Sequence, residues 1–259
     1  GTDLGPLKKE FAEGLCLDGV RVIAPATHDT GSAVAAAALS ERSAFISSGT
    51  WSLIGVELKA PLINADVARL NFTNEGGAYG TIRFLKNVMG LWIFESCRKE
   101  WAAAGLDVDY ETLLAGVNNM EGFDSLIFPD DDRFLSPPSM LAAIAEQLTE
   151  TGQALSDVPA RVCRMIFDSL AFRYASVLGS IEALTGRELD DIFVLGGGGR
   201  NAYLNRMTAN ASGLLVRAGL TEATVVGNVL VQSITAGRFS SLDEARRHVS
   251  DNVQLEEFR

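Results

Sequence analysis

The sequence predicts an α/β protein in which helices flank a mixed β-sheet. Short apolar runs rich in β-branched residues alternate with longer segments whose apolar residues recur at helical spacing. Two early runs, 44–47 and 51–58, stand on either side of a Ser-Gly turn, so the sheet is expected to contain antiparallel strands as well. With 259 residues, 47% of them hydrophobic, the chain is long enough to bury a large core.

The first part of the chain is predicted to place three strands around one helix. Residues 20–24 (VRVIA) are a short apolar run and indicate a buried strand. Residues 25–32 form a turn-rich loop, and 32–39 consist of strong helix formers. The run 44–47 then enters a turn, and the apolar-polar alternation of 51–58 predicts the second strand of a hairpin.

The middle of the chain is predicted to be mainly helical. Residues 71–80 contain three glycines and read as a loop. Residues 83–101 have apolar positions at helical spacing and predict one long helix, although a glycine interrupts them. The acidic, proline-containing stretch 118–138 is expected to be a surface excursion. Two further helices are expected at 138–147 and 160–184.

The last part alternates strands and helices. Residues 191–195 (DIFVL) form a short apolar run that predicts a buried strand, and it ends in four glycines. A helix is expected at 201–211, a strand at 214–217 and a helix at 222–237.

Charge and cysteine usage exclude several classes of partner. The net charge of −11 makes the chain a poor partner for polyanions, so nucleic-acid binding is not expected. Apolar residues nowhere run on for the roughly 18 positions that a membrane span needs, so no membrane partner is expected. The three cysteines, Cys16, Cys97 and Cys163, are widely spaced and predict neither a disulfide framework nor a zinc site. A reducing, cytoplasmic location fits them best.

Several catalytic signatures are absent. The two histidines, His28 and His248, are too few and too far apart for an HExxH metalloprotease or a histidine-rich metal site. No lysine follows a glycine, which excludes a Walker A loop, and no G-x-S-x-G elbow occurs. We therefore expect no metal held by side chains alone.

The first candidate site is the run His28-Asp29-Thr30-Gly31-Ser32, between a predicted strand and a predicted helix. Open α/β sheets bind ligands at such strand ends, and helix amino termini offer unpaired N–H groups to anions. Asp29 can act as a general base on a hydroxyl. The alternative is that Asp29 only caps the helix, as aspartate readily does, although a cap explains neither the adjacent histidine nor the glycine.

The second candidate site is the glycine run 196–199 followed by Arg200 and Asn201. Glycines between a strand and a helix let backbone amides approach phosphate closely, with the helix dipole assisting. The alternative is a tight turn that needs positive φ, for which one glycine would suffice. The run also satisfies G-x-G-x-x-A, but the next predicted strand ends in Arg217 rather than in the acidic residue that a dinucleotide site needs.

Weaker candidates lie between these two sites. The run Ser47-Ser48-Gly49-Thr50-Trp51, at the hairpin turn, suits contacts to phosphate or another polar ligand, but Ser-Gly turns are also common in loops of no function. Asn87 is expected near the start of the long helix, where it either reaches a ligand or is a surface residue. The acidic run 130–132 can bind a hard cation, but a solvated loop is the preferred interpretation.

Two classes of enzyme compete for these motifs. Asp-Thr-Gly also occurs in aspartic proteases, which need two such carboxylates and a β-dominated fold, whereas this chain has one, followed by an alanine-rich helix. A phosphotransferase without a Walker A loop uses both glycine-containing motifs, one beside the acceptor hydroxyl and one at the nucleotide.

Seven stretches of the chain resemble the C-terminal half of FGGY-family carbohydrate kinases, and most of all the rhamnulokinases, in the order that the family has them. They are APATHDTGSAVAAAAL, SSGTWSLIGVE, NFTNEGG, LKNVMGLWIFE, DDRFLSPPSM, GGGGRNAYLN and EATVVGNVLVQ. The His-Asp-Thr and Gly-Gly-Gly runs are shared broadly in the family, and the Thr-Asn-Glu-Gly-Gly stretch is more specific to its rhamnulokinases.

The resemblance implies an actin-like, ribonuclease-H-like ATPase fold and a reaction that phosphorylates L-rhamnulose at its 1-hydroxyl with ATP and Mg²⁺. It assigns Asp29 as the catalytic base. It assigns sugar contacts to His28, Thr30 and Asn87. It assigns ATP contacts to Gly49, Thr50, Glu95, Gly197, Gly198 and Asn201. Glu95 departs from the glutamine that the family often has, which weakens that assignment because a carboxylate beside phosphate is repulsive.

The resemblance also implies that residues 1–259 are the nucleotide-binding C-terminal lobe and that a sugar-binding N-terminal lobe is its partner. The opening GTDLGPL reads like the interior of a longer protein. We expect this lobe alone to be inactive or nearly so, because in-line transfer needs both walls of the cleft. Two alternatives remain open: a kinase for another ketose such as L-fuculose, and a non-catalytic sugar- or nucleotide-binding domain of the same fold.

Overall fold

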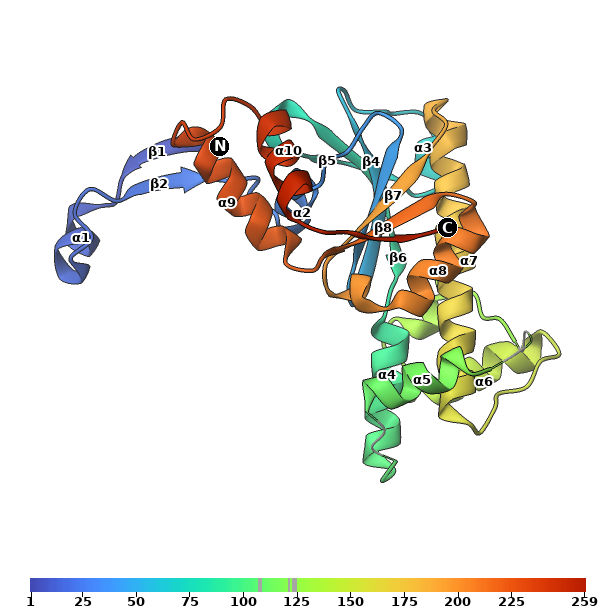
Figure 1. Ribbon diagram of the computed structural model, residues 1–259. Coiled ribbons are helices and arrows are strands. Elements are labelled where there is room, and N and C mark those ends of the chain that lie inside the picture. Colours follow the sequence, from blue (N-terminus) through green and yellow to red (C-terminus); the bar gives the residue numbers. More distant parts are fainter. Residues whose placement is uncertain (107–108, 121, 123–124) are drawn as a thin grey trace.

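The computed structural model describes residues 1–106, 109–120, 122 and 125–259. Within that part of the chain a mixed sheet has the strand order β5-β6-β4-β3-β7-β8-β9 (Figure 1). Its strands are β3 (Ser43–Ser48), β4 (Trp51–Leu58), β5 (Thr73–Gly76), β6 (Ile82–Met89), β7 (Asp191–Leu195), β8 (Leu215–Leu220) and β9 (Glu256–Phe258). Strand β7 pairs in parallel with β3 and β8, and the other pairs are antiparallel. The mixed sheet and its hairpin are therefore confirmed.

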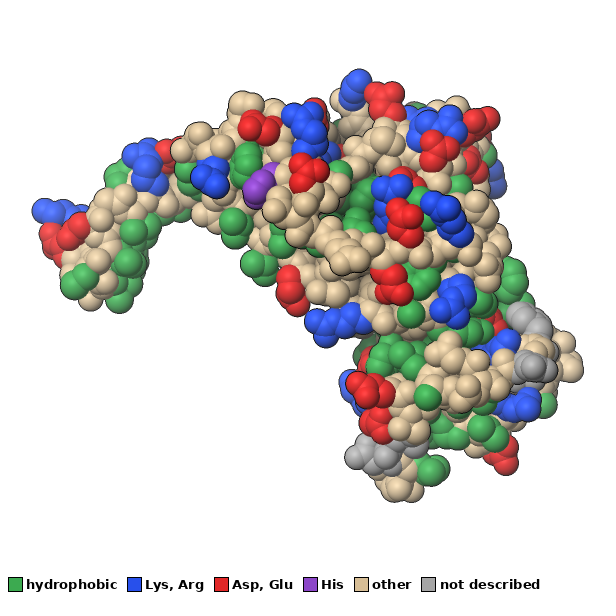
Figure 2. All heavy atoms as spheres, viewed as in Figure 1, with side chains coloured by type: hydrophobic (Ala, Val, Ile, Leu, Met, Phe, Trp, Pro, Cys, Tyr) green, Lys and Arg blue, Asp and Glu red, His purple; other side chains and the backbone are tan. Residues whose placement is uncertain are grey.

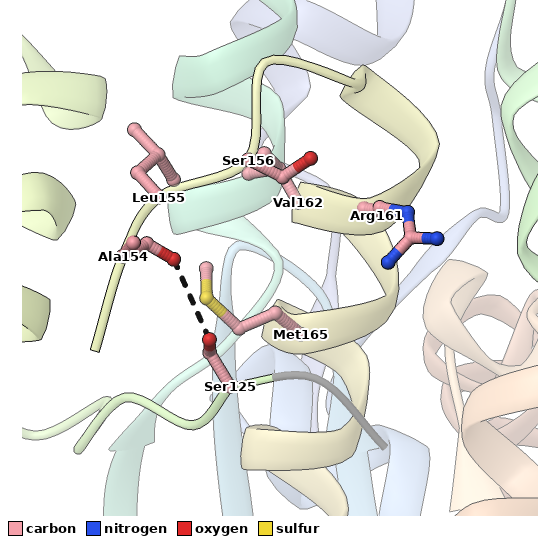
Figure 3. Close-up of a pocket in the computed structure, with 7 residues that line it drawn as sticks. All are labelled: Ser125, Ala154, Leu155, Ser156, Arg161, Val162 and Met165. Atoms are coloured by element: carbon pink, nitrogen blue, oxygen red, sulfur yellow. Dashed lines mark hydrogen bonds between the residues drawn. The ribbon is translucent and has the colours of Figure 1, made fainter. Parts of the chain in front are cut away.

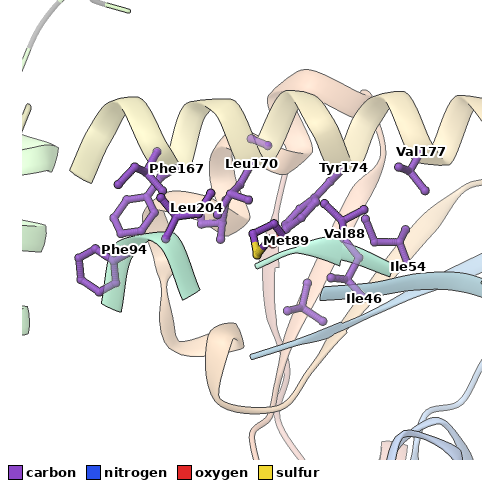
Figure 4. Packing of buried hydrophobic residues seen from close by; sticks show 14 of the residues in the cluster. Ile46, Ile54, Val88, Met89, Phe94, Phe167, Leu170, Tyr174, Val177 and Leu204 are labelled. Atoms are coloured by element: carbon purple, nitrogen blue, oxygen red, sulfur yellow. The ribbon is translucent and has the colours of Figure 1, made fainter. Parts of the chain in front are cut away.

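Helices cover both faces of this sheet. On one face lie α2 (Asp29–Ala36), α9 (Ala223–Thr235) and α10 (Leu242–Asn252), and on the other α7 (Pro159–Thr185) and α8 (Ala202–Ser212) (Figure 1). Successive strand residues point to opposite faces, so Phe45 packs with α2 while Ile46 packs in the core under α7. Figure 4 shows Tyr174 and Val177 of α7 lying over Ile46, Ile54 and Val88 of the sheet.

A group of helices surrounds the amino-terminal part of α7 beyond the sheet. It consists of α4 (Trp92–Ala103), α5 (Tyr110–Asn118) and α6 (Met140–Glu150) (Figure 1). The ring centroids of Phe94 and Phe167 lie 5.2 Å apart in its core. The predicted helices 138–147 and 160–184 correspond to α6 and α7, and the predictions for β7, α8, β8 and α9 are likewise confirmed. Short elements complete the description: α3 (Ala65–Arg69), η1 (Ala78–Gly80), η2 (Asp132–Phe134) and η3 (Gly197–Arg200).

An arm formed by β1 (Thr2–Pro6), α1 (Lys9–Leu15) and β2 (Arg21–Ala24) extends away from the body of the molecule (Figure 1). The prediction that 20–24 is buried is wrong. Strand β2 pairs only with β1 among the described strands, and Val20 and Val22 are 41% and 38% exposed. A two-stranded sheet has no second layer of its own to cover such side chains.

The prediction of one helix over 83–101 is wrong, because strand β6 ends at Met89 and α4 starts at Trp92. Both faces of β6 are buried, with Phe84 and Val88 on one side and Leu85 on the other, so its apolar residues do not alternate clearly. At Gly90 a side chain would lie 2.7 Å from the Gly49 carbonyl oxygen, so the chain needs a glycine where strand gives way to helix.

Two loops also differ from expectation. The predicted loop 71–80 contains β5, and the helix expected from residue 32 starts at Asp29. Residues 121, 123 and 124 of the expected surface excursion lie outside the described residues, but its later part is tied to the body, where Phe134 is fully buried. The acidic run there is not a simple solvated loop: Asp130 and Asp131 are half-buried and pair with Arg173 and Arg133 at 2.6 and 3.0 Å.

Candidate active site

Two of the predicted motifs and Asn87 meet at a hollow of about 530 Å³ beside the ends of β3 and β6. Its lining residues come from the start of α2, the end of β3, the β3–β4 turn and strands β4, β5 and β6: His28, Asp29, Thr30, Ser47, Ser48, Gly49, Thr50, Trp51, Leu53, Glu75 and Asn87. Of the predicted site residues, it brings together His28, Asp29, Thr30, Gly49, Thr50 and Asn87. Glu95, Gly197, Gly198 and Asn201 do not line it.

Asp29 is the first residue of α2, and its side chain is 77% exposed at the hollow. One carboxylate oxygen accepts a hydrogen bond from the Thr30 backbone N–H at 2.6 Å and lies 3.0 Å from His28 Nδ1. The residue at the helix cap is His28, and it makes no side-chain capping bond. The capping interpretation therefore does not describe Asp29, whose carboxylate binds its nearest neighbours and faces the hollow.

Helix α9 fixes the position of α2. Thr224 Oγ1 donates to the Asp29 carbonyl at 3.2 Å. Next to it the two helices approach so closely that a side chain at Gly227 would lie 1.7 Å from the Ser32 carbonyl oxygen. Such backbone contact leaves α2 little room to shift relative to the sheet.

The start of α4 fixes the β3–β4 turn. The Gly49 and Thr50 carbonyls accept hydrogen bonds from the Leu91 and Trp92 N–H groups at 3.0 and 3.1 Å. Gly90 packs directly on this turn. The turn is thus held by backbone bonds, which leaves its side chains free to face the hollow.

The glycine run lies directly behind this turn. A side chain at Gly198 would lie 2.0 Å from Ser48 Oγ, and Gly196 has a φ of +87°. Both glycines are therefore required by local geometry. Around Gly197, in contrast, a side chain would meet no atom within 4 Å, so neither packing nor φ requires glycine there. The run and Asp29 thus approach the same turn from two sides.

Asn201 and Glu95 have structural partners of their own. Asn201 is fully buried and caps α8, since its Oδ1 accepts from the Leu204 N–H at 3.0 Å. Glu95 lies in the first turn of α4 and pairs with Arg98 at 3.0 Å. Asn201 therefore joins the glycine loop to α8, since its own N–H donates to the Gly198 carbonyl at 3.0 Å.

Asn87 lies on strand β6 and not at a helix start as expected, because the predicted long helix is a strand at this point. It pairs with Leu53 of β4, and its side chain is exposed at the hollow. A neighbouring hollow of about 480 Å³ shares Asn87 and Trp51 with the first one and extends towards Asp130 and Arg173.

Sequence reasoning missed Glu75 at this site. Glu75 lies on β5, opposite Arg83 of β6, and their side chains pair at 3.1 Å. Burial lowers the pKa of the Arg83 guanidinium, while Glu75, Asp29 and Glu57 oppose the shift. The sequence around Glu75 is an Asn-Glu-Gly-Gly run, and its glycines predict a loop and not a strand.

The remaining features do not compete with this hollow. Another one, of about 290 Å³, lies beside α7 and is lined by residues such as Ser125, Leu155 and Met165, none of them predicted as a site residue (Figure 3). Among the described residues, no three or more His, Cys, Asp or Glu side chains are grouped to hold a metal ion. No helix in that part of the chain is long and apolar enough to cross a membrane.

Comparison with known proteins adds a family and a fold. Residues 44–236 match the C-terminal domain of the FGGY family of carbohydrate kinases. The rhamnulokinase of Bacteroides thetaiotaomicron is 46% identical over 259 residues, which are all of this chain and 53% of that protein. The rhamnulokinase of Bacillus subtilis is 38% identical over the same shares. The chain thus spans about half the length of these relatives.

Solved structures resemble the chain in fold at low identity. A gluconate kinase from Lactobacillus acidophilus superposes with a TM-score of 0.71 and 12% identity, over 99% of this chain and 51% of that one. A xylulose kinase from Rhodospirillum rubrum gives 0.68 and 17%, over 99% and 50%. These likenesses confirm the predicted actin-like α/β architecture.

Proposed function

The chain belongs to the FGGY family of carbohydrate kinases, and we propose that the protein transfers the terminal phosphoryl group of ATP to a hydroxyl of a deoxy-ketose. L-Rhamnulose is the ketose that we propose it prefers. The observation that carries this proposal is the shared hollow, where the Asp29 carboxylate faces the turn that the glycine run supports. The preference for L-rhamnulose rests on the rhamnulokinases that resemble the chain.

Asp29 is the residue that we assign as proton acceptor. The attacking sugar hydroxyl donates a hydrogen bond to its carboxylate and gives up its proton there, as the new bond to the terminal phosphorus of ATP forms and the bond from that phosphorus to ADP breaks. The hydrogen bond from the Thr30 N–H holds one carboxylate oxygen in place, and His28 Nδ1 lies 3.0 Å from the same oxygen. Phosphoryl transfer depends mainly on positioning, so this fixed orientation matters more than basicity.

The nucleotide is assigned to the opposite wall. Gly49 and Thr50 line the hollow. Gly198 packs on the adjacent Ser48, where a side chain would lie 2.0 Å from Ser48 Oγ, and around Gly197 a side chain would meet no atom within 4 Å, which leaves space for a phosphate. Backbone N–H groups in such a loop suit phosphate oxygens. Asn201 is assigned a supporting role, because it is buried as the cap of α8. A nucleotide contact for Glu95 stays a prediction.

Mg²⁺ fits this site as a companion of ATP. In the described part of the chain no cluster of three ligating side chains exists, but Mg²⁺ is commonly held by phosphates, water and one or two carboxylates. When ATP is bound, its phosphates and water would hold the ion, and no lining side chain is assigned to it. When bound, the ion would neutralise phosphate charge.

We propose that residues 1–259 form one lobe of the kinase and that a second lobe closes over the hollow. The chain spans about half of the relatives that resemble it. The arm exposes Leu4 and Leu15 at 65% and 66%, and Figure 2 shows apolar side chains along it, a surface suited to packing against further protein. The unpaired cysteines fit a cytoplasmic location.

Ketose-dependent release of ADP by the full-length protein tests the proposal. L-Rhamnulose, L-fuculose and D-xylulose are supplied with Mg-ATP, and we expect the highest kcat/KM with L-rhamnulose. Binding of a ketose with no turnover on any of them would contradict a kinase and support a binding domain. A clear preference for L-fuculose would contradict the substrate assignment alone.

A further inference from the structure

Three charged residues form a row across the sheet beneath the hollow. Arg83 of β6 lies directly opposite Glu57 of β4 and Glu75 of β5. Side chains at such opposed positions project from the same face of a sheet. That face is the one that α2 covers, and Leu85 of the same strand packs there. Arg83 is 2% exposed, so its guanidinium is buried within the wall of the site.

Arg83 pairs with a residue that lines the hollow. Its Nη2 lies 3.1 Å from Glu75 Oε2, and its Nε and Nη2 donate to the Gly76 carbonyl at 3.1 and 3.0 Å. Its Nη1 is buried with no hydrogen-bond partner in the part of the chain that the structure describes. Above the guanidinium lies the first turn of α2, where a side chain at Gly31 would be 3.6 Å from Arg83 Cζ.

This arrangement contributes little to the stability of the fold. A buried N–H without an acceptor lowers stability, and a buried ion pair is often no better than apolar residues of the same size. It does, however, fix a carboxylate. Glu75 is 30% exposed and lines the hollow together with Asp29 and Asn87. The Oε2 atom pairs with Arg83, and among the described residues Oε1 has no hydrogen-bond partner, so it can accept from a ligand.

Resting on the proposed function, we propose that Glu75 binds hydroxyl groups of the sugar and that Arg83 is the positioning residue that holds Glu75 in place. Two carboxylates then have separate tasks in one hollow. Asp29, which accepts from the Thr30 N–H and lies beside His28, takes the proton. Glu75, paired with arginine, accepts hydrogen bonds from hydroxyls that do not react, and so selects among ketoses.

The test measures KM and kcat for L-rhamnulose in the full-length protein, together with the Kd of an ATP analogue. We expect E75Q to raise KM roughly ten-fold or more, since a charged acceptor is lost. The kcat and the nucleotide Kd should stay within about two-fold. We expect R83M to raise KM similarly, and R83K, which keeps the charge, to raise it less.

The double variant E75Q/R83M separates positioning from mere support of the fold. If Arg83 acts through Glu75, the KM of the double variant equals that of E75Q alone, because the second substitution removes no further sugar contact. An additive rise in KM together with a fall in melting temperature would overturn the positioning role. The exposed Glu188, which pairs with Arg42, provides the matched control E188Q, expected to behave as wild type.

Failure of this inference differs from failure of the proposed function. An active wild type whose KM is unchanged in E75Q overturns the role of Glu75 and leaves the kinase assignment standing. A wild type that phosphorylates no ketose overturns the proposed function, and the sugar contact with it.

Discussion

Asp29 and Glu75 are two carboxylates in one hollow with different neighbours. Both line one hollow, but Glu75 lies against a buried arginine, whereas Asp29 contacts a backbone N–H and a histidine. Carboxylates in one site with different partners commonly divide catalysis and binding between them. Glu75 lies against Arg83 because strands β5 and β6 pair, and sequence motifs alone do not say which strands pair.

Tyr174 is a second residue with a testable role. Its hydroxyl lies 2.6 Å from Ser52 Oγ beneath the β3–β4 turn, and burial raises its pKa to about 12. In the unfolded chain a tyrosine deprotonates near pH 10. Between these pH values the unfolded chain loses a proton that the folded chain keeps, so the free energy of unfolding falls as pH rises above about 10.

Denaturant unfolding at pH 8 and at pH 11 measures this effect. We expect Y174F to be less stable at pH 8 by about 1–3 kcal/mol, because Ser52 loses its buried partner. We also expect its loss of stability between the two pH values to be smaller than in the wild type. An equal loss in both proteins would show that Tyr174 does not carry the alkaline sensitivity.

The sequence signal for candidate site residues is strongest where it is local. His28, Asp29 and Thr30 are adjacent in the chain, and the structure places all three at one hollow. Glu75 was missed because its importance comes from Arg83, eight positions away and on another strand. The structure adds that Asn201 caps α8, a role that depends on where the helix starts, and its contact with ATP stays a prediction.

At the scale of elements, the crossing of α2 and α9 positions the proposed base. We expect G227A to force the helices apart, because a side chain there would lie 1.7 Å from the Ser32 carbonyl oxygen. The expected cost is about 1–3 kcal/mol of stability, as for other overpacked contacts, with a lower kcat because Asp29 moves. Thermal unfolding and steady-state kinetics of the full-length protein measure both.

The matched control is G179A in α7, where a side chain would meet no atom within 4 Å. Alanine is the better helix former, so this variant should be as stable as wild type or up to about 1 kcal/mol more stable. If G227A matched it, the close crossing would not be what fixes α2.

Elements were predictable where one pattern covered the whole segment. The long amphipathic helix α7 and strand β7 agree with the sequence pattern closely. Strand β6 was taken for the start of a helix because both of its faces are buried, and because Arg83, Lys86 and Asn87 interrupt the apolar residues at irregular spacing. This segment is a strand because it pairs with β4 and β5, and a short stretch of sequence does not contain that pairing.

At the scale of the whole molecule, the hollow is open on one side in this chain. Asp29 is 77% exposed, and an exposed carboxylate exchanges its bond to a sugar hydroxyl with water. We therefore expect residues 1–259 alone to release little or no ADP with L-rhamnulose and Mg-ATP. A sensitive coupled assay measures this, and robust turnover by this chain would contradict the need for a second lobe.

The overall architecture was predicted more fully than its details. Alternating strands and helices indicated the mixed α/β sheet, and the ordered motifs indicated the family. The arm was not foreseen, since nothing local distinguishes a strand paired in the body from one paired in a projecting hairpin. Only the arrangement of the whole chain decides which apolar runs become buried.

The most direct test of the account compares wild type with D29N in the full-length protein, through the rate of L-rhamnulose-dependent ADP release. Asp29 and the nucleotide wall are separate parts of one hollow. We predict that the rate falls by roughly 10²-fold or more, while the Kd for ATP stays within about two-fold. Wild-type turnover by D29N would contradict the assignment of Asp29 as the proton acceptor.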